Sequence, residues 1–172
     1  MSLNRALSFV GGPRFRAMLV AAFVASCVTR RRWWSAAMLV AASTGMGAIN
    51  TGLKVLVRRE RPRGLPGLKQ AGGYSFPSGH TSGSVVFLGV VGYLVWRMTR
   101  NRILGSGVFC AFGILAGLIG RSRVELQAHH RGDVVAGYAM GTIWLALVVR
   151  VFARPLGREY PVPRSRTSED TA

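Results

Sequence analysis

The chain has 172 residues, which is the length of one domain, and 49% of them are apolar. Its formal net charge of +17 would suggest nucleic-acid binding if the basic residues formed a stripe, but they lie in clusters between uncharged apolar runs. Such clusters are typical of loops that flank membrane spans, so we predict a membrane-embedded protein without a nucleic-acid partner.

The N-terminal segment 2–12 carries apolar residues on one helical face before a Gly-Gly-Pro break, a pattern that predicts a short interfacial helix. No cleavable signal peptide is expected, because no small-residue cleavage site follows an apolar core. The next run, Ala17–Val28, is short for a span, and Arg14 and Arg16 would have to extend toward the headgroups for it to cross. We predict that it crosses the membrane; a re-entrant or interfacial segment is the alternative.

Four further apolar runs have the length of membrane spans once their polar ends are included: Trp33–Leu53, Thr81–Trp96, Ile103–Gly120 and Val134–Val149. The predicted fold class is therefore all-α, a polytopic bundle of about five transmembrane helices. Residues 1–152 are predicted to form the membrane-embedded domain, and the polar residues 153–172 a disordered tail. Glycine pairs at four-residue spacing indicate close helix packing: Gly79 and Gly83, Gly113 and Gly117, Gly137 and Gly141.

Ionisable residues other than arginine are rare in this chain, so their positions are informative. If the last four of the five runs cross the membrane, one face holds four of their ends. These are the end of the second run, the start of the third, the end of the fourth and the start of the fifth. Lys54, all three histidines and Asp133 then meet on that face. Charged groups at a membrane edge are costly and usually functional. Cys27 and Cys110 lie within apolar runs, which argues against a disulfide or a metal cluster.

The residues that meet there suit phosphoryl transfer. Lys54, Arg61 and Arg123 could clamp phosphate oxygens, the arginines doing so with two donors each. Ser78 lies where it could cap the next helix, so that the backbone N–H groups of Gly79 and His80 would form an anion site. The carboxylates near the site are too few for a two-metal clamp, so we predict neither a metal nor a cofactor.

Two histidines are expected to have different catalytic roles. His129 and Asp133 are four residues apart, which would place them on one helical face. The carboxylate could then hold one imidazole nitrogen and leave the other to attack phosphorus. His80 remains as the general acid. His130 is interpreted as a support of the site or a headgroup contact, and a basic loop is interpreted as solvated and attractive to anionic headgroups: Arg58, Arg59, Arg63 and Lys69. Arg121 and Arg131 stay unassigned.

Three segments carry a family resemblance: KVLVRRERP at 54–62, PSGH at 77–80 and SRVELQAHHRGD at 122–133. In residue type, spacing and order they resemble the three-part signature of the type 2 phosphatidic acid phosphatases, a superfamily that includes bacterial acid phosphatases and vanadium haloperoxidases. The resemblance covers about residues 39–149. It implies a phosphohistidine at His129, oriented by Asp133, with His80 as general acid. It also implies a phosphate-binding set: Lys54, Arg61, Ser78, Gly79 and Arg123.

The resemblance also shapes the expected fold and function. Membrane members commonly have six spans, and this chain shows five, as though the first were missing. We expect a metal-independent membrane phosphatase that hydrolyses a phosphomonoester or diphosphate of phosphatidate, phosphatidylglycerol phosphate or a polyprenyl carrier. The alternatives are a non-catalytic lipid-phosphate-binding protein and a vanadate-dependent haloperoxidase. The two faces carry nearly equal numbers of basic residues, so the charges do not set the orientation. From the family we expect the plasma membrane, with the active site on its outer face; the sequence does not set the oligomeric state.

Overall fold

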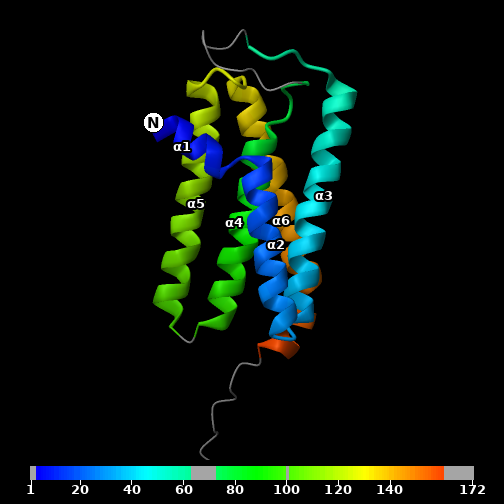
Figure 1. Cartoon of the computed structure of the whole chain (residues 1–172), viewed down its shortest axis with the longest axis vertical. Helices are drawn as coiled ribbons and strands as arrows, with labels where there is room; N and C mark the ends of the chain where they lie inside the picture. Colours follow the sequence, from blue (N-terminus) through cyan, green and yellow to red (C-terminus); the bar gives the residue numbers. More distant parts are fainter. Residues whose placement is uncertain (1–2, 63–72, 100, 161–172) are drawn as a thin grey trace, which may run out of the picture.

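The computed structural model describes residues 3–62, 73–99 and 101–160. Within these ranges the regular structure is six α-helices and no strand. Most of the helices run side by side in one bundle, while the first crosses the others near one end (Figure 1). The helices are α1 (Leu3–Val10), α2 (Pro13–Thr29), α3 (Trp33–Val57), α4 (Gly79–Met98), α5 (Arg102–Glu125) and α6 (Arg131–Glu159). The predicted all-α membrane bundle is confirmed.

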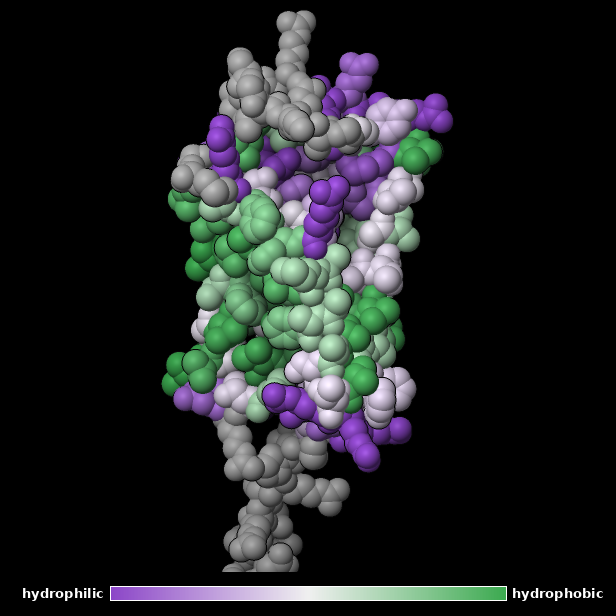
Figure 2. All heavy atoms as spheres, viewed as in Figure 1, coloured by the Kyte–Doolittle hydropathy of each residue, from purple (hydrophilic) through white to green (hydrophobic). Residues whose placement is uncertain are grey.

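Helices α3 to α6 are each long and apolar enough to cross a bilayer. Helix α2 qualifies as a fifth span together with α1, from which it is bent by 49°. The bend falls at Gly11 and Gly12, just before Pro13 opens α2 with a position that needs no N–H partner. On the face shown in Figure 2, apolar side chains form a band with hydrophilic residues at both ends. This is the surface expected of a protein surrounded by lipid.

The helix starts agree with local sequence signals. The hydroxyl of Ser78 accepts from the backbone N–H of Thr81 at 3.4 Å and from its hydroxyl at 2.9 Å, so Ser78 caps α4 as predicted. Asn101 caps α5 in the same way, its side-chain oxygen accepting from the N–H of Leu104 at 3.0 Å. Both caps satisfy backbone donors that would otherwise lack partners at a helix end.

The predicted boundary of the disordered tail at residue 153 is wrong for residues 153–159, which continue α6 despite Pro155. Two contacts hold this last part of the helix. Leu156 is fully buried, and the carboxylate of Glu159 accepts from the N–H of Ser35 at 3.2 Å and from its hydroxyl at 2.7 Å. A carboxylate at the N-terminus of α3 is favourable for the helix dipole. The remainder of the predicted tail, 161–172, lies outside the described residues.

Helix α4 lies at the centre of the bundle and packs against α3, α5, α6 and α2. Its fit against α6 depends on Gly137 and Gly141, where an added Cβ would come within 3.0 Å or less of backbone oxygens of Ser78 and Ser82. The packing predicted for this pair is confirmed. The packing predicted for Gly113 and Gly117 is wrong, because both face open space on α5.

Candidate active site

The ends of α3 and α5 and the starts of α4 and α6 lie together at one end of the bundle, beside the bend between α1 and α2 (Figure 1). A cavity of about 370 Å³ opens there. Five of the predicted site residues line it: Lys54, Arg61, Gly79, His80 and His129. The predicted convergence of these residues on one face is therefore confirmed.

His129 lies just before α6, not on it, because the helix begins at Arg131 with His130 as its N-cap. The expectation that His129 and Asp133 share a helical face is therefore wrong. They meet because Asp133, in the first turn, reaches back to the N-cap, where its Oδ2 accepts from the N–H of His130 at 2.9 Å. The same oxygen lies 3.5 Å from Nδ1 of His129. That separation is long for a hydrogen bond, and Nδ1 has no closer partner among the described residues.

The other carboxylate oxygen of Asp133 pairs with Arg59, whose Nη1 donates at 3.0 Å. Asp133 is fully buried, whereas the Arg59 side chain is 44% exposed. The interpretation of Arg59 as part of a purely solvated loop is therefore wrong. The sequence offered no signal for this pair, because 74 residues separate the partners. Arg63 and Lys69 of the same predicted loop lie outside the described residues.

The second nitrogen of His129 faces the cavity side. Nη1 of Arg61 lies 3.3 Å from Nε2 of His129. Because an arginine can only donate, Nε2 must accept in this contact, which leaves the ring proton on Nδ1, toward Asp133. The pKa of His129 is lowered to about 4, first by burial and then by the charges of Arg61, Arg123 and Lys54, while Asp133 opposes them. His129 is therefore neutral at pH 7, with its lone pair on the nitrogen that faces Arg61.

His80 lies in the first turn of α4 and lines the same cavity. Its ring makes no hydrogen bond to any part of the chain that the structure describes, so both nitrogens are available to a bound molecule. Gly79 precedes it, and an added Cβ there would lie 3.1 Å from the amide oxygen of Asn50. The open N-terminal turn of α4 therefore presents backbone donors and an imidazole to the cavity, a setting that suits an anion.

Lys54 is positioned by the backbone of the segment that leads into α4. Its Nζ donates to the carbonyl oxygens of Tyr74 at 2.8 Å, Pro77 at 2.9 Å and Ser75 at 3.4 Å. The ammonium group thus holds this segment against the end of α3 while it lines the cavity. A compact point donor suits three converging carbonyls.

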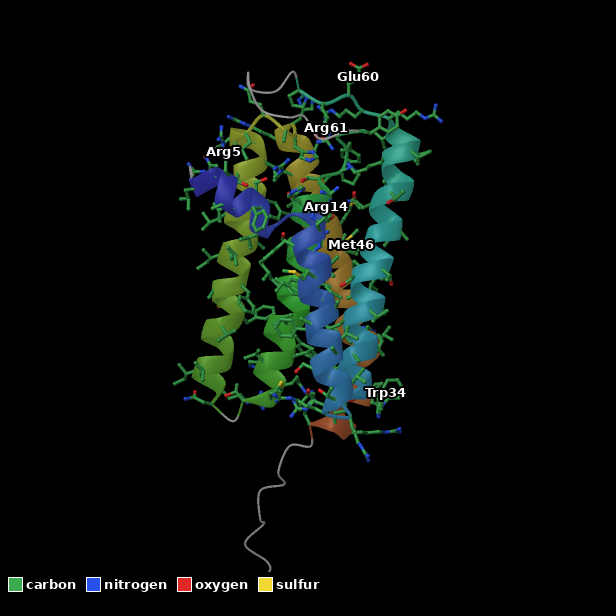
Figure 3. All side chains as sticks on the ribbon, viewed as in Figure 1. Arg5, Arg14, Trp34, Met46, Glu60 and Arg61 are labelled. Atoms are coloured by element: carbon green, nitrogen blue, oxygen red, sulfur yellow. The ribbon has the colours of Figure 1, made fainter. Side chains whose placement is uncertain are left out.

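Arg61 joins two loops. Figure 3 shows Glu60 pointing away from the helix ends and Arg61 lying toward them. The Arg61 side chain donates to the carbonyls of Gly73 at 3.0 Å and Ala128 at 2.8 Å. The second of these contacts lies next to His129, so Arg61 both lines the cavity and holds the loop that carries the histidine.

Arg123, like Ser78 and Asp133, is a predicted site residue that does not line the cavity. It is buried in the last turn of α5, where Nη1 donates to the hydroxyl of Ser8 in α1. Its carbonyl accepts from the N–H of His129 at 3.2 Å. Arg123 therefore positions His129 through the backbone and acts on it through charge. The unassigned Arg121 pairs with Glu125 at 2.6 Å, and Arg131 is exposed.

Several residues line the cavity that the sequence did not single out for the site, and Asn50 and Arg16 are two of them. Asn50 is buried on α3 and donates to the hydroxyl of Ser82 at 2.9 Å. Arg16, which was expected to extend toward the headgroups, instead turns inward against α4. A charged residue next to an apolar run was the available signal, but the sequence could not give the direction of its side chain.

The cavity wall is cationic. Within the described part of the chain, three basic residues line it, and no aspartate or glutamate does. Among the described residues, no three His, Cys, Asp or Glu side chains lie together in a group that could hold a metal ion. The arrangement thus has a neutral imidazole, a second imidazole and a set of cationic donors around one anion-sized space.

Comparison with known proteins agrees with this arrangement. A family model described as the PAP2 superfamily matches residues 32–155. Phosphatidylglycerophosphatase B of Bacillus subtilis (strain 168) is 26% identical over 146 residues, which are 83% of this chain and 70% of that protein. The crystal structure of a transmembrane PAP2 type phosphatidylglycerolphosphate phosphatase from Bacillus subtilis superposes with a TM-score of 0.79 at 25% identity, covering 91% of this chain and 77% of that one.

Proposed function

The chain belongs to the PAP2 superfamily, and from that premise we propose that it hydrolyses the terminal phosphomonoester of phosphatidylglycerol phosphate through a phosphohistidine intermediate. It is a multi-pass membrane phosphatase of the lipid-phosphate type. The choice of substrate is supported by the Bacillus subtilis sequence and structure matches, whose names specify phosphatidylglycerol phosphate.

The observation that carries the proposal is the position of His129 between Asp133 and Arg61. Asp133 lies 3.5 Å from Nδ1, and Arg61 lies 3.3 Å from Nε2. This pairing favours the tautomer with a proton on Nδ1 and a lone pair on Nε2, which is the form a nucleophilic histidine needs. Contacts of this kind often shorten when substrate binds.

In the first step, Nε2 of His129 attacks phosphorus, an N–P bond forms, and the bond from phosphorus to the glycerol oxygen breaks. His80 gives its proton to that oxygen, so phosphatidylglycerol leaves with a hydroxyl group in place of an alkoxide. In the second step, His80 takes a proton from a water molecule whose oxygen attacks phosphorus. The N–P bond breaks, inorganic phosphate leaves, and His129 is again neutral.

The positive charge that stabilises the transition state comes from the protein in this proposal. Lys54, Arg61 and the first turn of α4 face the phosphate, and Arg123 adds charge from behind His129. Arg59 holds the Asp133 carboxylate in place through their ion pair. With this donor set, we propose that hydrolysis requires no metal ion.

We further propose that the protein lies in the plasma membrane with the site on the outer face. Cysteines introduced at Glu60 and Asn101, in a background lacking Cys27 and Cys110, would test this in intact cells. Both positions are exposed, and they lie at opposite ends of the bundle. A membrane-impermeant maleimide should label the cysteine at 60 and not the one at 101. The reverse pattern would place the site on the cytoplasmic face.

The experiment that tests the function is phosphate release by the purified protein in detergent from phosphatidylglycerol phosphate, phosphatidate and a polyprenyl diphosphate. We expect turnover with phosphatidylglycerol phosphate as the best substrate and no turnover by the His129→Ala variant. Binding of the lipids without release of phosphate would favour the non-catalytic alternative. Oxidation of bromide by peroxide only after addition of vanadate, without lipid turnover, would favour the haloperoxidase.

A further inference from the structure

The cavity continues beyond the catalytic residues into the gap between α2, α3 and α4. Its deeper wall includes Arg16, Met46, Asn50 and Gly83. Figure 3 shows Met46 between the helices, below the level of Arg61. The proposed chemistry at His129 and His80 makes no use of this deeper part.

Arg16 is the charged residue of that wall. Its guanidinium lies directly against Gly83, where an added Cβ would collide with it. The structure gives this side chain one hydrogen bond, from Nη1 to the carbonyl of Gly11 at 3.0 Å. A guanidinium has five N–H donors, so most of them remain available to the cavity. Among the residues that the structure describes, no carboxylate lines the cavity to balance the charge.

A partly buried cation without a carboxylate partner is costly, and such a residue within a membrane protein usually serves a ligand. The adjacent Arg14 shows the contrast, because it is exposed on the same helix. Figure 3 labels it near the start of α2. The sequence could not separate these two arginines; the structure turns only Arg16 toward the cavity.

Gly83 lies three residues after His80 on α4, which places both on the same side of the helix. The guanidinium of Arg16 therefore lies about one helical turn, ~5 Å, further along α4 than the general acid. His80 protonates the leaving oxygen in the proposed mechanism, so Arg16 faces the part of the substrate that leaves with that oxygen.

We propose that Arg16 binds a second phosphate of the substrate, the phosphodiester that lies one glycerol away from the scissile phosphate. This inference rests on the proposed function and names a specificity-determining residue for it. Phosphatidate has no second phosphate, and in a polyprenyl diphosphate the second phosphate is bonded directly to the scissile bridge oxygen. The separation of about one helical turn suits the glycerol-spaced group better than the directly bonded one.

The test compares kcat/KM on phosphatidylglycerol phosphate, phosphatidate and a polyprenyl diphosphate, in one detergent, for the wild type and three variants. Arg16→Gln should lower the ratio of kcat/KM for phosphatidylglycerol phosphate over phosphatidate by about 10- to 100-fold, the loss expected for a charge-assisted contact. Gly83→Ala should lower it in the same direction, because the new methyl group displaces the flexible guanidinium at little cost to folding. The matched control, Arg14→Gln, should keep the wild-type ratio.

If the wild type is active and neither Arg16→Gln nor Gly83→Ala changes the ratio of kcat/KM for phosphatidylglycerol phosphate over phosphatidate, the inference is overturned. The proposed function would then still stand. If Arg16→Gln instead lowers kcat/KM only for the polyprenyl diphosphate, the assignment of Arg16 to the glycerol-spaced phosphate is wrong. If the wild type turns over none of the lipids, the proposed function is contradicted. The Arg16 subsite can then be tested by calorimetry, which measures ligand binding without turnover. Arg16→Gln should weaken propane-1,3-bisphosphonate binding about tenfold or more relative to propylphosphonate; equal weakening of both would refute the subsite.

Discussion

Asp133→Asn is the substitution that most sharply separates a catalytic from a structural role. The asparagine keeps the shape of the side chain but has one acceptor oxygen in place of two. In the native protein, Oδ1 accepts from Arg59 at 3.0 Å, and Oδ2 accepts from the N–H of His130 at 2.9 Å and lies 3.5 Å from Nδ1 of His129. The amide nitrogen of the variant must therefore face at least one donor.

The loss in stability follows from these contacts. Asp133 is fully buried, so a donor that loses its acceptor there costs about 1–3 kcal/mol. Arg59 is 44% exposed and can turn to water, which keeps the cost near the lower end of that range. The loss in activity has a different cause, because an amide cannot fix the proton on Nδ1 of His129. We expect kcat to fall by about 10²–10⁴-fold.

The pH dependence of the rate is an independent test, because the substitution should move the pKa of His129 in a known direction. Asp133 raises the pKa of His129 against burial and the neighbouring cations, which together leave it at about 4. Removing the carboxylate charge lowers that pKa. The acid limb of kcat/KM, which reports the free enzyme, should therefore move to lower pH in Asp133→Asn even though the rate falls.

The assay is initial phosphate release from a lipid phosphate between pH 3 and 8, together with the thermal midpoint in detergent. Arg59→Gln is the matched control, since it removes the ion pair but leaves the carboxylate beside His129; its kcat should fall less than that of Asp133→Asn. A folded Asp133→Asn protein with wild-type kcat would refute the orienting role and reduce Asp133 to a helix-capping residue.

Three further predictions concern the same site. His80→Ala should lose about 10²–10⁴-fold on a lipid phosphate, whose alkoxide needs a proton, and much less on an aryl phosphate with an acidic phenol; equal losses in initial rate on both would refute the general acid. Lys54→Arg should lower kcat at least about tenfold, because a planar guanidinium cannot match the three carbonyls that hold Nζ; unchanged turnover would mean that Lys54 is only an anchor. Activity should survive EDTA and be inhibited by vanadate, whereas loss on chelation that magnesium restores would contradict a metal-independent mechanism.

Much of the fold was accessible from the sequence because hydrophobic length and connectivity are strong signals in a membrane protein. The uncharged runs gave the spans α3 to α6, and the alternation of their directions placed Lys54, His80 and His129 on one face. The cap at Ser78 followed from its position before an apolar run. These inferences needed no knowledge of side-chain orientation.

The parts that failed all depended on local geometry. Spacing alone put His129 on a helix with Asp133, but the helix starts two residues later and the contact forms through its N-cap. The partners Arg59 and Asp133 are far apart in sequence, so no periodicity links them. For Arg16, connectivity gave the correct end of the bundle but not the direction of the side chain, which depends on the space left by Gly83.

The central claim is a covalent bond between phosphorus and His129. Its direct test is to mix the enzyme with a lipid carrying ³²P in the terminal phosphate, stop the reaction in alkali within one turnover, and map the labelled peptide. Alkali preserves phosphohistidine, whereas the phosphoester of serine and the acyl phosphate of aspartate are lost. We expect label on His129 in the wild type, an increased amount in His80→Ala when an aryl phosphate is used, and none in His129→Ala. Full turnover with no labelled histidine, or label on His130, would contradict the account.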